Sequence, residues 1–237
     1  MLTDVYNVAF RRDINILIKK SYNKTIDVEF GIYKDDKLTI NLMPSDGAID
    51  WKINLDFFKK KVKPTYAKSN SKVKIHEGFY NEWMENRDSF FDIIKSNEEL
   101  SKAINNGFYC VGRSKGGSEA IIIALDIIRN FNIDKDNVFV GALDAAKTGN
   151  KAFCDSVEKY IHKENIYTVR YNHDIITQIP PFSGYDNPGV KIRVGSGALI
   201  MPLVDHAFGC FKEEELQLFA RKYDTYFEGT KENVRLK

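Results

Sequence analysis

The stretch Phe108-Tyr109-Cys110-Val111-Gly112-Arg113-Ser114-Lys115-Gly116-Gly117-Ser118-Glu119-Ala120-Ile121-Ile122-Ile123-Ala124-Leu125 decides the fold of this 237-residue chain. Its first residues form an apolar and aromatic run, which is typical of a buried strand. Residues 112–116 then fit the pattern G-x-S-x-G, and a helix-forming apolar run follows directly. In such a strand-to-helix turn, the residues two before and two after the serine come so close that neither tolerates a side chain. Glycine at positions 112 and 116 meets that condition.

This context predicts a particular chemistry for Ser114. A serine on a sharp turn between a strand and a helix projects its hydroxyl clear of the backbone. The amino terminus of the following helix favours a developing negative charge, and the N–H of Lys115 is one donor for an oxyanion. A glycine loop that holds a phosphate is the alternative, but the P-loop pattern fails because no Lys-Ser/Thr follows at the required offset. We therefore interpret Ser114 as a candidate nucleophile.

Length and composition suit a single globular domain over residues 1–237, with 35 basic and 33 acidic side chains. This near balance gives no sign of a nucleic-acid partner, and the lysine run at residues 59–63 is interpreted as a solvated loop. The three cysteines, Cys110, Cys154 and Cys210, lack metal-binding spacing and are expected to be free and buried in a reducing compartment. No signal peptide and no membrane-length apolar run is seen, so we expect a cytoplasmic protein, or one released by lysis.

Apolar periodicity predicts an α/β architecture. Residues 5–20 carry helical spacing, residues 25–33 and 38–43 form a hairpin, and residues 59–72 form a loop. Two strand-helix-strand units after residue 108 predict parallel neighbours in a sheet that has helices on both faces. The remaining predicted elements are strands at 73–75, 137–143, 165–171 and 190–194, and helices at 77–95, 98–105, 149–163 and 212–223.

A serine nucleophile needs a base, and the base needs an acid to orient it, in the chain order Ser, acid, His. Of the histidines after the serine, His162 is expected on a polar helix end, at the surface. His173 directly precedes a candidate acid, and neighbouring loop residues rarely make the required pair. His206 lies in a late loop before the last helix, where the base is expected.

Two aspartates are candidates for the acid. Asp174 follows the predicted strand at residues 165–171, and Asp144 follows the one at 137–143. Both positions are physically suitable, so the residues alone leave the choice open.

Four blocks of this chain resemble the class 3 lipase family, the α/β-hydrolases that include fungal triacylglycerol lipases. In chain order, residues 73–80 resemble V-H-x-G-F-L, 111–117 resemble V-x-G-H-S-L-G-G, 148–153 resemble V-G-N-x-x-F, and 171–181 resemble H-x-x-D-I-V-P-x-L-P-P. The resemblance implies the α/β-hydrolase fold, with a central, mostly parallel sheet and an N-terminal antiparallel hairpin. It also implies Ser114 as the nucleophile, Asp174 as the acid and His206 as the base, which leaves Asp144 outside the catalytic set.

The same resemblance extends to the segment before the serine. Asp50-Trp51 and Asn54-Leu55 hold the register of the family's R-G-T/S-x-S-x-x-D-W-x-x-D-L block, which places Ser45 as the second oxyanion donor. Residues 46–55 would then correspond to the lid of the fungal enzymes; the alternative is an element docked on the core.

Three departures from the family pattern stand out. Met43-Pro44 replaces Arg-Gly, Arg113 replaces His, and Lys115 replaces Leu. Pro44 donates no hydrogen bond, which weakens the expectation for the second oxyanion donor. The Lys115 side chain is expected near the mouth of the site, either facing an anionic lipid headgroup or solvated without a role.

The implied function is that of a serine carboxylester hydrolase of lipase type, which cleaves lipid or other acyl esters through an acyl-enzyme. Its expected partners are the ester substrate and, transiently, a lipid interface; no metal, no cofactor, no nucleic acid and no transmembrane segment is expected. The alternatives are a thioesterase or phospholipase on the same fold and a non-catalytic, hydrolase-like binding module.

Overall fold

A computed structural model describes residues 1–22, 26–44, 61–62, 72–181 and 184–195, together with residues 217, 220–222 and 224. Its main sheet has seven strands in the order β1-β2-β3-β6-β7-β9-β11. The first three strands pair antiparallel, and every pairing from β3 to β11 is parallel. The strands are β1 (Ile14–Tyr22), β2 (Ile26–Tyr33), β3 (Leu38–Pro44), β6 (Phe108–Arg113), β7 (Val138–Leu143), β9 (Ile166–Tyr171) and β11 (Val190–Val194). The predicted hairpin and the predicted mostly parallel sheet are confirmed.

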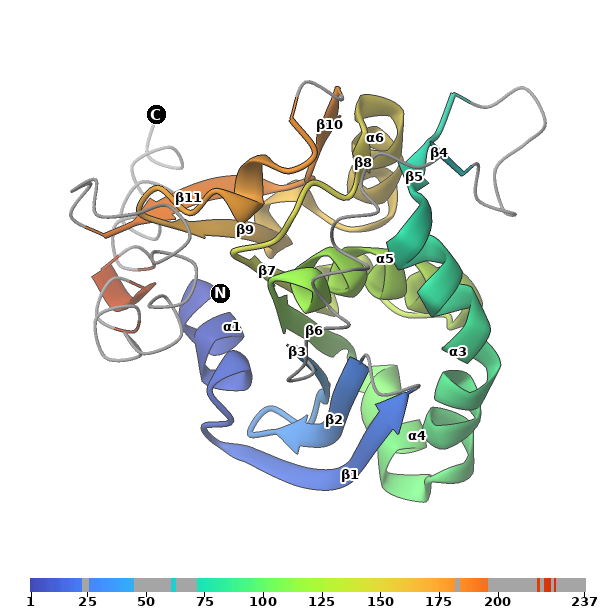
Figure 1. Ribbon diagram of the computed structural model, residues 1–237. Helices are drawn as coiled ribbons and strands as arrows, with labels where there is room; N and C mark the ends of the chain where they lie inside the picture. Colours follow the sequence, from blue (N-terminus) through green and yellow to red (C-terminus); the bar gives the residue numbers. More distant parts are fainter. Residues whose placement is uncertain are drawn as a thin grey trace, which may run out of the picture.

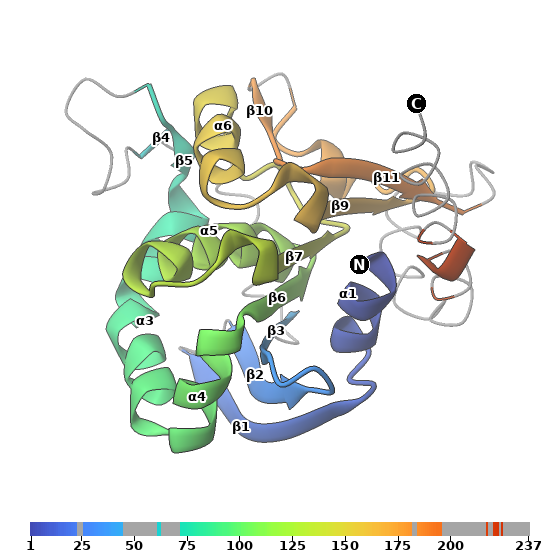
Figure 2. The same cartoon turned by 180° about the vertical axis from the view of Figure 1, so that it is seen from behind.

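Helices cover both faces of this sheet, as predicted (Figure 1). One face carries α3 (Glu77–Ser96), α4 (Glu98–Asn106), α5 (Lys115–Asn130) and α6 (Lys151–Tyr160), which build the larger apolar core with β2, β3, β6 and β7. The other face carries α1 (Leu2–Ala9), which packs on a smaller core. Figure 2 shows the same arrangement of elements from behind. Because the connections from β6 through α5 to β7 and from β7 through α6 to β9 run the same way, α5 and α6 lie on one side.

A small antiparallel sheet in the order β10-β8-β5-β4 lies beside α6 (Figure 1). Its strands are β4 (Lys61–Val62), β5 (Ile75–His76), β8 (Gly149–Asn150) and β10 (Tyr185–Asp186). Two predictions were wrong here: residues 59–72 were expected to be a loop throughout, and Gly149 was expected in a helix. The helix starts later because the side chain of Asn150 caps α6 by accepting the N–H of Phe153.

The single helix predicted for residues 5–20 is also wrong. The chain forms α1 up to Ala9, turns, and continues as the edge strand β1. Arg11 and Asp13 take left-handed conformations in the turn, at φ 59° and φ 58°. No glycine or proline announces the turn, so the apolar residues on either side were read as one helical pattern.

The last described residues of the chain return to its first helix. The Asp224 carboxylate accepts the N–H of Leu2 at 3.0 Å and the N–H of Thr3 at 2.8 Å, and Gln217 donates to Asn7. Asp224 therefore satisfies free amides at the amino terminus of α1, where a negative charge is favourable. The single domain over residues 1–237 stays a prediction. Within the described residues, no helix combines the length and apolarity that a membrane crossing needs.

Candidate active site

Ser114 occupies the turn between β6 and α5 in a strained backbone conformation, with φ 55° and ψ −123°. A Cβ on Gly112 would lie 2.2 Å from the carbonyl oxygen of Gly116, and a Cβ on Gly116 would lie 2.7 Å from that of Leu42. Both distances are too short for any side chain, so the predicted need for two glycines is confirmed. The turn holds the serine at the carboxyl end of a central strand, directly before a helix.

Hydrogen bonds fasten this turn to the neighbouring strand. The Ser114 N–H donates to the carbonyl of Leu143 at 2.8 Å, and the Ser114 carbonyl accepts from Gly117 at 3.1 Å. One turn later, the Ser118 hydroxyl donates to the carbonyl of Ala146 at 2.9 Å. The strained conformation persists because these contacts with the end of β7 and the segment after it over-determine it.

Asp174 lies fully buried in the loop that follows β9, at the same edge of the sheet as Ser114. Its N–H donates to Tyr171, and its Oδ1 accepts the N–H of Ile176 at 2.8 Å. The Thr177 hydroxyl donates to the Asp174 carbonyl at 2.8 Å. The loop therefore holds this carboxyl in one place.

Asp144, the rival acid, makes contacts that connect neighbouring strands. It follows β7 at φ 48°, and its Oδ1 accepts the N–H of Tyr171 at 2.7 Å. Its Oδ2 lies 3.4 Å from Nε of Arg113, and its own N–H donates to Val169. Asp144 thus connects the end of β6, directly before Ser114, to β9.

The structure does not describe all of the residues that the sequence singled out. His206, Ser45, Cys210 and the lid segment at residues 46–55 lie outside the described residues. His162 contacts Asp136, and the ring of His173 faces Arg193, with 2.8 Å between Nε2 and Nη2.

Cys110 and Cys154 are free and buried, as predicted. Burial raises the pKa of the Cys110 thiol far above its usual range and that of Cys154 to about 12. Neither thiol is therefore a ready nucleophile, because the thiolate is the reactive form.

The expectation that the Lys115 side chain lies near the mouth of the site is wrong. The side chain is 4% exposed, and its Nζ lies 2.8 Å from Glu82 Oε1 and 3.8 Å from Glu119 Oε1. The ammonium is buried between α5 and α3, while the backbone N–H stays directly after Ser114.

Sequence reasoning missed this cluster of two glutamates and a lysine, although it left a signal. Lys115 and Glu119 are four residues apart on one helix, which is the spacing of an intrahelical ion pair. Glu82 lies three residues after Phe79, on the buried side of α3.

His76 is a second buried polar residue near the start of α3. Its ring stacks on Phe79 at 4.2 Å between centroids, and its backbone N–H donates to the carbonyl of Thr148 at 2.8 Å. Burial lowers the pKa of His76 to about 4, so the ring is neutral at pH 7.

Comparison with known proteins places this geometry in a family. A family model described as Lipase (class 3) matches residues 43–184. A secreted mono- and diacylglycerol lipase of Malassezia restricta is 25% identical over 173 residues, which cover 71% of this chain and 55% of that protein. The chain thus spans about half the length of the curated relatives it matches. That relative is named as secreted, so the expectation of a cytoplasmic protein has no support from it.

Solved structures share the fold at low sequence identity. The native propeptide complex of Rhizomucor miehei lipase superposes with a TM-score of 0.64 at 18% identity, covering 82% of this chain and 66% of that one. A triacylglycerol lipase of Penicillium expansum gives 0.64 at 18% identity, covering 82% and 77%. These likenesses confirm the α/β-hydrolase fold. With the family model covering more than half of its residues, the chain belongs to the class 3 lipase family.

Proposed function

We propose that this protein is a serine carboxylester hydrolase of lipase type, with Ser114 as its nucleophile. The observation that carries the proposal is the strained conformation of Ser114 between β6 and α5, held by the close approach of Gly112 and Gly116. Strain of this kind costs about 1–3 kcal/mol and persists where it serves a function. Asp174 is the proposed acid and His206 the proposed base.

The proposed reaction passes through an acyl-enzyme. The Ser114 hydroxyl oxygen attacks the ester carbonyl carbon while the His206 imidazole accepts its proton. The imidazolium then gives that proton to the leaving alcohol as the carbon–oxygen bond breaks. Water repeats the sequence on the acyl-enzyme and releases the carboxylic acid and the free serine. Asp174 holds the imidazole in the tautomer that makes this possible, and its buried, hydrogen-bonded position suits that task.

The proposed oxyanion donors are the backbone N–H groups of Lys115 and Ser45. The N–H of Lys115 is the first backbone amide of α5, directly after Ser114, at the helix end that favours negative charge. Ser45 directly follows β3 in the sequence, and Leu42 of β3 pairs with Gly112 in β6. The register of the family's block and this sequence position support Ser45 as the second donor, in spite of the proline before it.

The substrate class is proposed by analogy with the relatives. One is named as a mono- and diacylglycerol lipase, and acylglycerols or other acyl esters are accordingly the substrates we propose, reached at a lipid interface. The alternative of a non-catalytic, hydrolase-like module makes no use of a strained serine.

Ester turnover distinguishes the proposed hydrolase from a non-catalytic binding module. On p-nitrophenyl butyrate, Ser114→Ala should lower kcat by about three orders of magnitude or more, and Asp174→Asn by a comparable factor, because the triad acts as a unit. Circular dichroism must show that both variants fold. Wild-type turnover in folded Ser114→Ala would remove the proposal and favour the binding module.

A further inference from the structure

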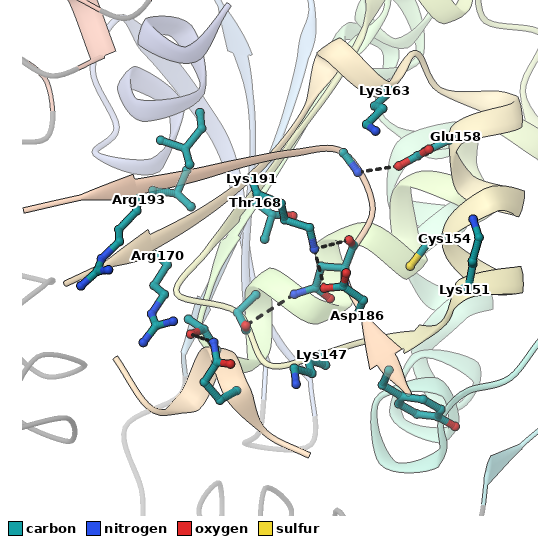
Figure 3. Close-up of a pocket in the computed structure, with 18 of the residues that line it drawn as sticks. Lys147, Lys151, Cys154, Glu158, Lys163, Thr168, Arg170, Asp186, Lys191 and Arg193 are labelled. Carbon is teal, nitrogen blue, oxygen red and sulfur yellow. Dashed lines mark hydrogen bonds and ion pairs between the residues drawn. The ribbon is translucent and has the colours of Figure 1, made fainter. Parts of the chain in front are cut away.

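A cavity of about 890 Å³ lies between α6, the carboxyl halves of β9 and β11, and β10 (Figure 3). Ser114 is not among the residues that line it. The α6 end carries Lys151 and Cys154, whereas Arg170 and Arg193 extend at the opposite end in Figure 3. The two ends differ in how their charges are neutralised.

The three carboxylates that line this cavity all have partners. Asp155 pairs with Lys151 at 2.7 Å, and Asp186 pairs with Lys191. The Glu158 carboxylate accepts the N–H of Gly189 at 2.9 Å. These contacts lie along α6 and the β10–β11 connection. Because the described acidic side chains of the cavity are paired there, the end with the two arginines has an excess of positive charge.

Arg170 and Arg193 lie at the other end of the cavity. They are register partners on the parallel strands β9 and β11, so their side chains leave the same face of the sheet at neighbouring positions. Among the residues that the structure describes, no carboxylate pairs with either guanidinium. Arg193 contacts the ring of His173, which is not an anion. Two like charges at facing register positions repel each other, so the pair costs free energy as it stands.

The Nε of Arg170 adds an unmet hydrogen-bond donor. This atom is buried and has no hydrogen-bond partner in the described part of the chain. A buried donor on a charged group that lacks a partner destabilises the protein, because its desolvation is not compensated. A ligand that brings negatively charged oxygens would remove both costs at once.

We propose that this end of the cavity binds a phosphate group, either of a lipid headgroup or of a soluble phosphate ester. Guanidinium groups bind phosphate oxygens in bidentate fashion, and two adjacent ones match a tetrahedral anion. An acyl chain is a poor occupant, because most of the described lining residues are polar or charged and the side chains of Val169 and Ile192 belong to the core on the opposite face of the sheet. The amide of Gln178, which also lines the cavity, is a further donor nearby. The site goes beyond the proposed ester hydrolysis and does not depend on it.

Equilibrium dialysis with radiolabelled inorganic phosphate and with glycerol 3-phosphate tests the site at low ionic strength. All proteins carry Ser114→Ala, so that binding is measured without turnover and a failed esterase assay leaves the result intact. Arg170→Gln and Arg193→Gln should each raise Kd by about tenfold, because each removes a charge-assisted pair of hydrogen bonds. Lys151→Gln, which alters a paired cation in the same cavity, should change Kd less than about twofold.

Vesicle sedimentation distinguishes the two sources of phosphate. Arginine-dependent binding to vesicles that contain phosphatidic acid, without binding of the soluble probes, identifies a lipid headgroup. Arginine-dependent binding of the soluble probes identifies a soluble ester. The proposal is overturned if neither probe nor vesicle binds, or if folded Arg170→Gln and Arg193→Gln bind as tightly as Lys151→Gln. Thermal melts of each variant establish folding.

Discussion

At the level of single residues, the backbone strain of Ser114 lowers stability but fixes the position of its side chain. Its φ of 55° with ψ −123° is a conformation that glycine adopts freely and L-residues adopt at a cost. The strain belongs to the backbone, so removing the hydroxyl alone does not relieve it. Conformation and chemistry at this position are therefore separable by substitution.

Ser114→Gly should be more stable than Ser114→Ala by about 1 kcal/mol, because glycine relieves the strain and loses part of that gain to chain entropy. In a chain of this length, 1 kcal/mol corresponds to about 2–4 °C in Tm. Differential scanning calorimetry of the two variants measures the difference. A Tm of Ser114→Gly at or below that of Ser114→Ala would show that the turn is not strained as described.

His76 should make the fold sensitive to mild acid. Its folded pKa of about 4 lies below the ordinary value of 6.5, so the neutral ring contributes stability above pH 6.5 that is lost as the pH falls toward 4. Between pH 7 and pH 5 the loss is on the order of 2 kcal/mol. The variant His76→Phe keeps an aromatic ring against Phe79 but has no group that titrates there. Urea unfolding between pH 7 and pH 5 should show that its free energy of unfolding falls less steeply than that of wild type. Parallel curves for the two proteins would contradict the assignment.

The sequence predicts the centre of the candidate site better than its surroundings. The steric need for glycine at 112 arises within five residues, because a Cβ there would clash with Gly116, whereas a Cβ on Gly116 would clash with Leu42 in β3. The contacts of Lys115 involve Glu82, 33 positions away, and no local rule reports such a pair. A lysine beside a candidate active site was read as exposed because lysine usually is.

At the scale of elements, the buried ammonium of Lys115 joins α5 to α3. Its Nζ pairs with Glu82 on α3 and approaches Glu119 on α5 itself, so a buried charged cluster lies at the contact between the two helices. Such a cluster costs desolvation and repays it only while both signs of charge are present. The pairing also holds the amino terminus of α5, directly after Ser114, against a second element.

Removing the lysine alone should be costly. Lys115→Met leaves two buried carboxylates without their ammonium, and we expect a loss of about 3–5 kcal/mol in the free energy of unfolding. Adding Glu82→Met should destabilise by less than the sum of the two single changes, with a coupling of at least about 1 kcal/mol. Urea denaturation of wild type, the two single variants and the double variant measures this coupling as a double-mutant cycle. Additive losses would show that the pair is not coupled.

The helices and strands were predictable where the apolar periodicity changes at a turn that glycine or proline marks. Residues 108–130 switch cleanly from a buried strand to a helix at a glycine-bearing turn, and β6 and α5 follow. Residues 5–20 contain no glycine or proline that marks the turn. Arg11 and Asp13 form it instead, in left-handed conformations that usually favour glycine. The side chains of β1, an edge strand, are mostly half-buried or exposed, so its alternation is faint.

At the scale of the whole molecule, the chain closes on itself through Asp224. A carboxylate from the last described segment accepts both the Leu2 and Thr3 N–H groups of α1, more than 220 positions away. No sequence pattern joins residues so far apart, so this contact was not predicted. It makes the small core under α1 depend on both ends of the chain.

Asp224→Ala should lower the free energy of unfolding by about 1–2 kcal/mol, because two amides at a helix amino terminus lose a charged acceptor. The exposed neighbour Lys222 is a matched control, and Lys222→Ala should stay within about 0.5 kcal/mol of wild type. Urea unfolding monitored by circular dichroism compares the three proteins. Equal midpoints for Asp224→Ala and Lys222→Ala would contradict this account of closure.

The most direct measurement on the whole protein is covalent labelling with a fluorophosphonate, followed by mass spectrometry of the peptides. We expect wild type to carry one phosphonyl group on Ser114, because an activated serine displaces fluoride from such a probe. Ser96→Ala removes an exposed hydroxyl at the carboxyl end of α3 and should label as wild type does, whereas folded Ser114→Ala should carry no label. A wild-type protein that takes up no label, or that is labelled at another serine, would contradict the assignment of Ser114 as the nucleophile.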